Sequence, residues 1–124
     1  MSINLPLIAS RYPDQLPTYD ISSLLSNGIT PKQPGSVTAA VDTNHVYWDV
    51  RLVVAGAVDP DYTRFLEGIP VELMPAVHTS RIALHGVGVA QVQWNASYNF
   101  MQIYGARITN GELSFEARTL RRAV

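Results

Sequence analysis

The sequence predicts an all-β fold, either an antiparallel β-sandwich or a small barrel, with about six to eight short strands. Apolar and polar residues alternate over 45–54, so that Val46, Trp48 and Val50 share one face of an extended segment. An Asn-Gly pair at 110–111 lies between two further alternating runs, a pattern typical of a hairpin turn. Only short stretches show helical periodicity.

Residues 1–36 are predicted to form an extended N-terminal arm, and residues 37–124 the β domain. Five of the eight prolines lie in the arm. Proline fixes φ and favours an extended predecessor, so a long helix or an inner strand is excluded there. Within "DISSLLSNG", Asp20 can cap a helix and Gly28 can end it, which predicts a short helix near residues 20–27.

The first half of the domain gives clear strand signals. Val37, Ala39 and Val41 alternate with smaller or polar residues, which predicts one strand. "DTN" at 42–44 supplies turn residues, and the strand over 45–54 follows.

The middle of the domain is predicted to be mixed. Residues 59–68 are predicted to form a short helix, because Asp59 can cap it and Pro60 suits its first position. Residues 69–75 are expected to form only an edge strand, since their two prolines cannot donate to a ladder. Residues 77–94 return to strand periodicity, and glycines at 86 and 88 predict a bulge or bend.

The hairpin prediction extends to individual residue pairs. "YNFMQIYGARI" (98–108) is expected to be a strand that turns back through a type I′ turn at Asn110-Gly111. The predicted pairs are Thr109 with Glu112, Ile108 with Leu113, Arg107 with Ser114 and Ala106 with Phe115.

Composition limits the classes of function. Charged residues make up 15% of the 124 residues, well below the ~25% of an average soluble domain, which weakly favours packing against neighbouring proteins. The net charge of −1 argues against a nucleic-acid-binding protein, which needs a basic excess. The chain contains no Cys, so disulfides and thiolate chemistry are excluded.

The sequence also bears on location. "MSINLPLIAS" has neither the basic start nor the apolar stretch of a signal peptide, and the longest uncharged apolar run, residues 52–58, is too short to cross a bilayer. A soluble protein without membrane contact is therefore expected.

Candidate reactive groups do not form a recognisable motif. His45, His78 and His85 lack metal-ligand spacing, even with Asp49 added as a carboxylate ligand. Ser80, His78 and Asp49 would make a nucleophilic triad only on paper, because no "GxSxG" pattern is present. A carboxylate pair at positions 59 and 61 is explained by helix capping. We therefore predict no catalytic residue, no metal ligand and no cofactor.

A glycosylation pattern and several aromatic residues bear on recognition of sugars. "NAS" at 95–97 fits the glycosylation pattern but is attributed to chance. Trp48 and Trp94 are in phase with the apolar residues and are assigned to the core, whereas Tyr47 and Tyr98 are candidates for an interface. The aromatic set that could form a stacking platform is Tyr47, Trp48, Trp94, Tyr98, Phe100 and Tyr104.

The arm carries too many apolar side chains to remain in water. They must lie on the domain's own flank or on a neighbouring subunit, and the prediction favours a sister molecule. The predicted interface in the arm comprises Ile3, Leu5, Leu7, Ile8, Tyr12, Leu16, Tyr19, Leu24 and Leu25. At the other end, Arg118, Arg121 and Arg122 are expected to contact an acidic patch of a neighbour.

An extended apolar arm on a small β domain with few charges resembles small structural proteins of bacteriophages, namely capsid decoration or cement subunits, vertex proteins, and head-completion or tail components. The resemblance implies a non-enzymatic homo-oligomer in the virion, assembled in the host cytoplasm through its arm and sheet edges. Its implied partners are itself and other virion proteins, without nucleic acid or a small-molecule ligand.

Two alternatives remain open. One is a carbohydrate- or receptor-binding β-sandwich module with tyrosines on its loops. The other is a small β-barrel enzyme that uses His78, His85 or His45.

Overall fold

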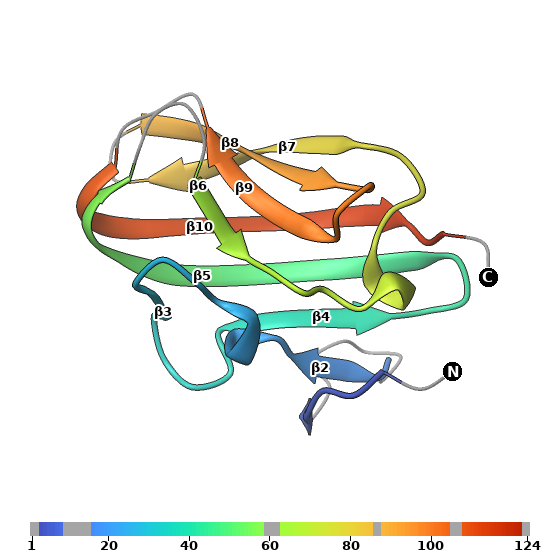
Figure 1. Ribbon diagram of the computed structural model, residues 1–124. Helices are drawn as coiled ribbons and strands as arrows, with labels where there is room; N and C mark the ends of the chain where they lie inside the picture. Colours follow the sequence, from blue (N-terminus) through green and yellow to red (C-terminus); the bar gives the residue numbers. More distant parts are fainter. Residues whose placement is uncertain (1–2, 9–15, 59–62, 86–87, 105–107, 123–124) are drawn as a thin grey trace.

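The computed structural model describes residues 3–8, 16–58, 63–85, 88–104 and 108–122. Ten strands form one antiparallel sheet, with two short 3-10 helices between them (Figure 1). The elements are β1 (Leu7–Ile8), β2 (Thr18–Asp20), η1 (Ser22–Leu24), β3 (Ile29–Pro31), β4 (Val37–Val41), β5 (His45–Val58), β6 (Thr63–Leu66), η2 (Val71–Leu73), β7 (Thr79–His85), β8 (Gly88–Asn95), β9 (Phe100–Tyr104) and β10 (Ile108–Leu120). The predicted all-β class is confirmed, with almost no helix.

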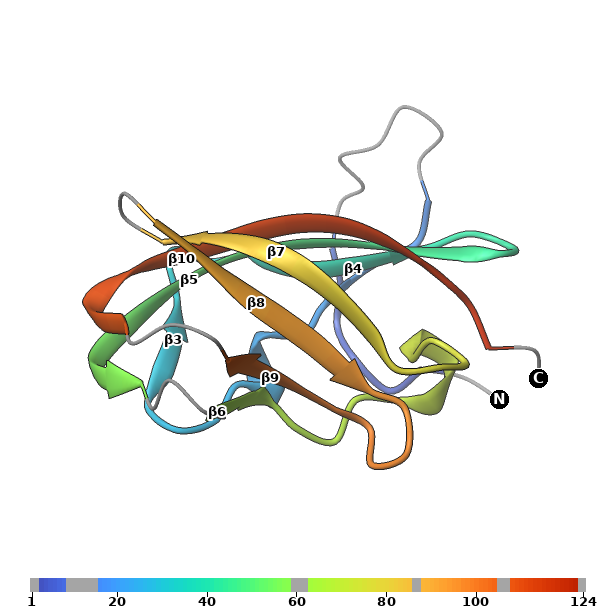
Figure 2. The same ribbon diagram turned by 90° about the horizontal axis from the view of Figure 1, so that it is seen from above.

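The sheet has the strand order β1-β2-β4-β5-β10-β7-β8-β9-β6, and β3 pairs with β5 in addition. It curls, so that β9 and β6 lie below the layer formed by β4, β5 and β10 (Figure 2). Among the described residues, no helix has the length and apolar character needed to span a membrane.

The core fills the concave side of this curl. Val46, Trp48 and Val50 of β5 are buried, as the alternation predicted. Trp48 and Trp94 have ring centroids 5.4 Å apart. The ring centroids of Trp94 and Phe115 of β10 lie 5.9 Å apart, with the two rings nearly perpendicular. These aromatic contacts join the two layers of the curled sheet.

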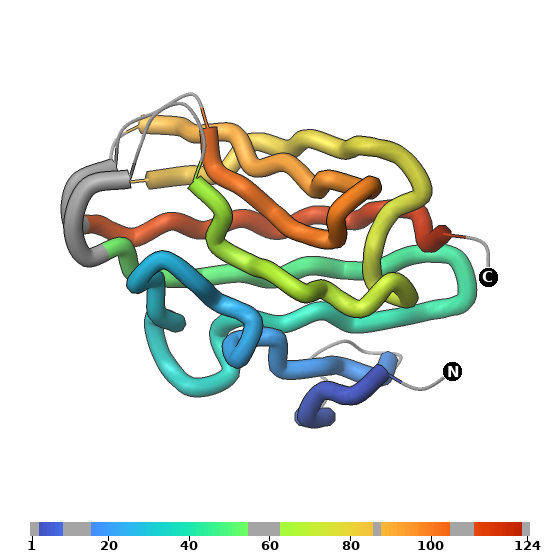
Figure 3. Tube along the Cα trace, viewed as in Figure 1, coloured from blue at the N-terminus to red at the C-terminus, as the bar shows by residue number. Residues whose placement is uncertain are grey.

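The N-terminal segment is part of this closure. Backbone pairing joins Leu25 to Leu66, so the segment after η1 covers the free edge of β6. The chain then continues into β3, which pairs with β5 (Figure 3). Ile21 and Ile29 are buried in the same core cluster as the domain's own strands. The described residues of 16–36 therefore lie on the flank of their own domain.

Three local predictions are corrected by the structure. Within the predicted helix 59–68, residues Thr63–Leu66 form β6, which pairs with β9; residues 59–62 lie outside the described residues. Within the predicted edge strand 69–75, Val71–Leu73 form the 3-10 helix η2.

The third correction concerns the hairpin. β10 continues through Asn110-Gly111 and pairs along its length with β5, with a register shift between Thr109 and Gly111. Leu113 is therefore opposite Leu52, and Phe115 is opposite Val50. The Asn-Gly pair marks a bulge in a long strand, because Gly111 lacks the positive φ that a type I′ turn requires. The expected partners Arg107 and Ala106 lie outside the described residues.

Candidate binding cleft between strands β7 and β10

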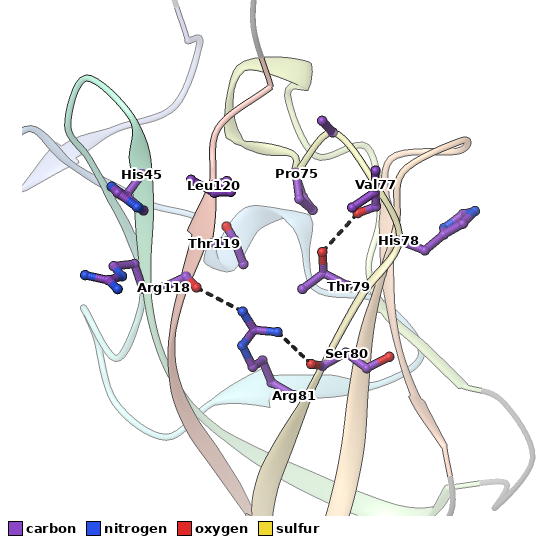
Figure 4. Close-up of a pocket in the computed structure, with 11 residues that line it drawn as sticks. His45, Pro75, Val77, His78, Thr79, Ser80, Arg81, Arg118, Thr119 and Leu120 are labelled. Carbon is purple, nitrogen blue, oxygen red and sulfur yellow. Dashed lines mark hydrogen bonds between the residues drawn. The ribbon is translucent and has the colours of Figure 1, made fainter.

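A cleft opens where β7 and β10 diverge. Among the described residues, these strands pair only at Leu113 with His85 and Ser114 with Leu84. Beyond this point they separate, and the segment leading from η2 into β7 closes the far end (Figure 4). The resulting pocket has a volume of about 720 Å³. Its lining comprises His45, Pro75, Ala76, Val77, His78, Thr79, Ser80, Arg81, Arg118, Thr119 and Leu120.

The hydrogen-bonding direction of each strand edge follows from the register. The N–H of Arg51 donates to the carbonyl of Ser36 (2.9 Å), and its carbonyl accepts from the N–H of Lys32 (3.0 Å), so both groups point away from β10. Ser114, opposite Arg51, must then direct its own N–H and C=O toward β7. Every second residue of a strand directs its backbone groups to the same side, so those of Glu116, Arg118 and Leu120 also point toward β7 and the cleft.

The opposing edge follows in the same way. Ser114 pairs with Leu84, so Leu84 presents its backbone groups to β10, and alternation assigns the same direction to Ile82 and Ser80. Two strand edges thus face each other across the cleft without a ladder between them.

Arg81 bridges these two edges. Its Nη1 donates to the carbonyl of Ser80 at 2.8 Å, and its Nη2 donates to the carbonyl of Arg118 at 3.2 Å (Figure 4). Arg81 lies on the same, inward-facing side of β7 as Thr79 and Ala83. It is nevertheless exposed, because the sheet is open at this position. The guanidinium replaces direct strand-to-strand hydrogen bonds by satisfying one carbonyl on each strand.

The lining is cationic and partly apolar. Arg81 and Arg118 contribute positive charge, and none of the described residues that line the cleft is acidic. Val77 and Leu120 are 70% and 66% exposed, so they offer apolar surface at the rim. Such a cleft suits a ligand that has an anionic group and an apolar body.

His45 at the rim belongs to a turn network centred on Asp42. The Asp42 carboxylate accepts hydrogen bonds from the N–H groups of Asn44 (2.8 Å) and His45 (2.7 Å) and from the Tyr47 hydroxyl (3.0 Å). The backbone hydrogen bonds from Asn44 and His45, in that order, lower the pKa of Asp42 most. The bond to Asp42 raises the pKa of the Tyr47 hydroxyl.

The three histidines do not converge. The Nδ1 atom of His78 accepts from the N–H of Ala96 at 3.2 Å, and the ring points away from the cleft (Figure 4). The Nε2 atom of His85 lies 3.1 Å from the carbonyl oxygen of Val89. The described part of the chain contains no group of three or more His, Cys, Asp or Glu residues suited to a metal ion.

The hypothetical triad is not assembled either. Ser80 Oγ lies 3.4 Å from the hydroxyl oxygen of Tyr104, whereas Asp49 lies on β5 with Oδ1 3.7 Å from Nε of Arg51. The carboxylates at positions 59 and 61 fall outside the described residues.

The aromatic residues do not form one platform. Trp48, Trp94 and Phe100 are buried, and the Arg64 guanidinium lies 4.1 Å from the Phe100 ring centroid. Tyr98 is exposed in the turn after β8, where Asn95 Oδ1 accepts from its N–H at 3.2 Å.

Most residues of the predicted arm interface contact their own domain. Ile3, Leu5, Tyr19, Leu24 and Leu25 are packed against the core cluster. Ile8 and Leu16 are half-buried, Leu7 is 65% exposed, and Tyr12 lies outside the described residues. These side chains are only partly buried on their own core, so contact with a sister molecule stays a prediction.

The predicted basic tail is likewise bound within the chain. Arg121 Nη1 donates to the carbonyl of Asp42 at 2.7 Å. Arg122 Nη2 donates to the carbonyl of Ala96 at 2.8 Å and to that of Pro75 at 3.4 Å. Arg118 is the tail residue that lines the cleft.

No known protein family matches the chain, and no curated protein matches it in sequence. Function is therefore argued from geometry.

Sequence reasoning missed Arg81. A usable signal existed, since an arginine in the inward phase of a strand indicates an interface, an opening or a protected edge. The divergence of β7 and β10 has no comparable local signal.

Proposed function

We propose that this protein is a non-enzymatic assembly subunit that associates with copies of itself, of the kind found among small structural proteins of phage particles. The observation that carries the proposal is an uncharged, partly apolar face on the β7–β8 hairpin. This outer face is defined by Ser80, Ile82, Leu84, Val89, Gln91 and Gln93, which lie opposite one another in the register.

The outer face exposes three large apolar side chains side by side. Ile82, Leu84 and Val89 are 67%, 60% and 59% exposed, and Leu84 lies directly opposite Val89. None of the six residues is charged. Exposed apolar patches bordered by polar residues mark association surfaces, and depletion of charge is typical of interface centres.

The neighbouring part of the sheet has the opposite character. On β5 and β10, Arg51 lies between Asp49 and Glu116, at 3.7 and 3.9 Å. Lys32 forms a further ion pair with Glu112 at 3.3 Å. The Lys32–Glu112 and Arg51–Glu116 pairs are exposed, which suits a surface that stays in solvent. The difference argues that, of these two parts of the outer face, the β7–β8 half is the one adapted to association with other copies.

The assembly proposal can be tested by charge insertion. We expect the full chain to form oligomers in light scattering, and an Ile82→Glu/Leu84→Glu double variant to be monomeric, because desolvating two carboxylates opposes association. A Thr30→Glu variant places a single carboxylate at an exposed position of β3 and should leave the mass unchanged. A monomeric wild-type chain at high concentration, or an oligomeric double variant, would contradict the proposal.

Placement in a phage particle is supported by the small β domain with few charges. Mass spectrometry of purified particles tests it directly. We expect the chain to be present in multiple copies per particle, and its absence from particles would overturn the virion assignment.

Of the two alternatives, a binding module is favoured by a specific observation, the cationic cleft between β7 and β10. The enzyme alternative requires two histidines to meet a carboxylate in a pocket. The described residues give each histidine a different local partner.

A further inference from the structure

We infer that the cleft between β7 and β10 accepts an extended peptide segment of another protein as an added strand, and that an acidic side chain of this segment pairs with Arg81. The segment would lie on the backbone edges of β7 and β10, whereas the outer face of the β7–β8 hairpin is made of side chains; Ser80 belongs to both.

The gap between β7 and β10 is wider than the spacing of paired strands. Neighbouring strands in a sheet lie about 4.8 Å apart, which leaves no room for a side chain between their backbones. Here the Arg81 guanidinium lies between the carbonyls of Ser80 and Arg118 and bonds to both. The strands are therefore wider apart than a ladder permits between the Ser114–Leu84 pair and the Pro75–Arg121 bridge.

Backbone groups of both strand edges face this gap. The register directs the N–H and C=O groups of Glu116 and Arg118 into the cleft from one side, and those of Ser80 and Ile82 from the other. An extended segment is the ligand whose donors and acceptors repeat with the same period along both edges. A globular surface or a compact small molecule lacks that repeat.

The cleft is positively charged. Arg81 has no acidic partner among the described residues, and the lining contains no carboxylate from the described part of the chain. An added strand would supply N–H groups to the carbonyls that Arg81 now satisfies. The guanidinium would then be free to pair with a carboxylate, which is a stronger partner than a neutral carbonyl. When the segment binds, the two carbonyls and the guanidinium that now pair with one another would each gain a new partner.

The inference can be tested with two capped peptides, TVEVT and TVQVT, which differ only in charge at the central position. We expect the full chain to bind TVEVT about tenfold more tightly than TVQVT in calorimetry, because the carboxylate gains a charge-assisted hydrogen bond. In an Arg81→Gln variant the ratio should fall to about one. In the matched control Arg51→Gln, which alters an exposed arginine of β5, the ratio should be retained.

Amide hydrogen exchange supplies a second measurement. Bound TVEVT should slow the exchange of the N–H groups of Ile82, Glu116 and Arg118, which face the cleft. Failure of both peptides to bind, or a preference for TVEVT that survives Arg81→Gln, would overturn the inference. So would protection of these amides by inorganic phosphate alone, since an anion site needs no strand edges. A monomeric chain that binds TVEVT would contradict the assembly proposal and still support this inference.

Discussion

At the scale of single residues, the turn between β4 and β5 depends on one carboxylate. Asp42 accepts two backbone N–H groups and the Tyr47 hydroxyl, and its pKa is lowered in the folded protein. A carboxyl group with a lowered folded pKa contributes stability above its unfolded pKa of about 3.9. That contribution is lost as the pH falls through the folded pKa.

An Asp42→Asn variant is therefore expected to be less stable than wild type at neutral pH, with a difference that shrinks on acidification. Urea unfolding midpoints at neutral pH and below about pH 3 would measure this. A difference of equal size at both pH values would show that the charge of Asp42 does not matter.

A buried polar pair links β5 and β10. The indole Nε1 of Trp48 donates to Oγ1 of Thr119 at 2.9 Å, and both residues are buried. Thr119→Val keeps the shape but removes the acceptor, which should cost about 1–3 kcal/mol of unfolding free energy. Thr119→Ser keeps the hydroxyl and serves as the control in the same denaturation series. Equal losses in the two variants would argue that packing dominates the hydrogen bond.

At the scale of elements, the backbone φ of Gly111 distinguishes a bulge in β10 from a hairpin turn. A Cβ added at Gly111 would meet no atom within 4 Å, and its φ is not in the left-handed region. Gly28 has equally open space but a φ of +73°. These two glycines therefore differ mainly in backbone conformation.

We expect Gly111→Ala to change the free energy of unfolding by less than about 0.5 kcal/mol, and Gly28→Ala to lower it by about 1–2 kcal/mol. Thermal unfolding of the two variants beside wild type is sufficient. If Gly111→Ala were the more damaging of the two, the residue would need the positive φ of a type I′ turn.

Strand β5 could be predicted from the sequence, because burial of one face makes apolar and polar residues alternate with a period of two. The secondary structure of the segments that follow it could not be predicted in this way. Pro60 and Gly68 are local signals of helix ends, yet the intervening residues 63–66 pair with β9, and Gly68 uses its positive φ after a strand. Pairing between distant strands outweighed these short-range preferences. The cleft likewise depends on how strands far apart in the sequence are placed. Arg81 was therefore the one residue whose position in the sequence indicated it.

At the scale of the whole molecule, the N-terminal segment holds the curled sheet closed. Ile21 and Ile29 are buried in the core, and residues 24–26 cover the edge of β6. Losing one large aliphatic side chain from a core costs about 2–5 kcal/mol, a large share of the ~5–15 kcal/mol that stabilises a domain.

Removing residues 1–31 should therefore abolish cooperative thermal unfolding as followed by circular dichroism. Removing residues 1–8 should leave a folded protein, because β1 pairs only with β2 at the edge of the sheet. A fragment 32–124 that melts as sharply as the full chain would show that the segment is an appendage.

The position of β10 has a consequence for biosynthesis. This strand follows the other nine along the chain, yet it lies inside the sheet between β5 and β7. While the polypeptide is being translated, β5 emerges from the ribosome long before its main neighbour exists. We expect the nascent chain to stay unfolded until residues 108–120 have left the exit tunnel, with its apolar strands shielded by chaperones in the meantime.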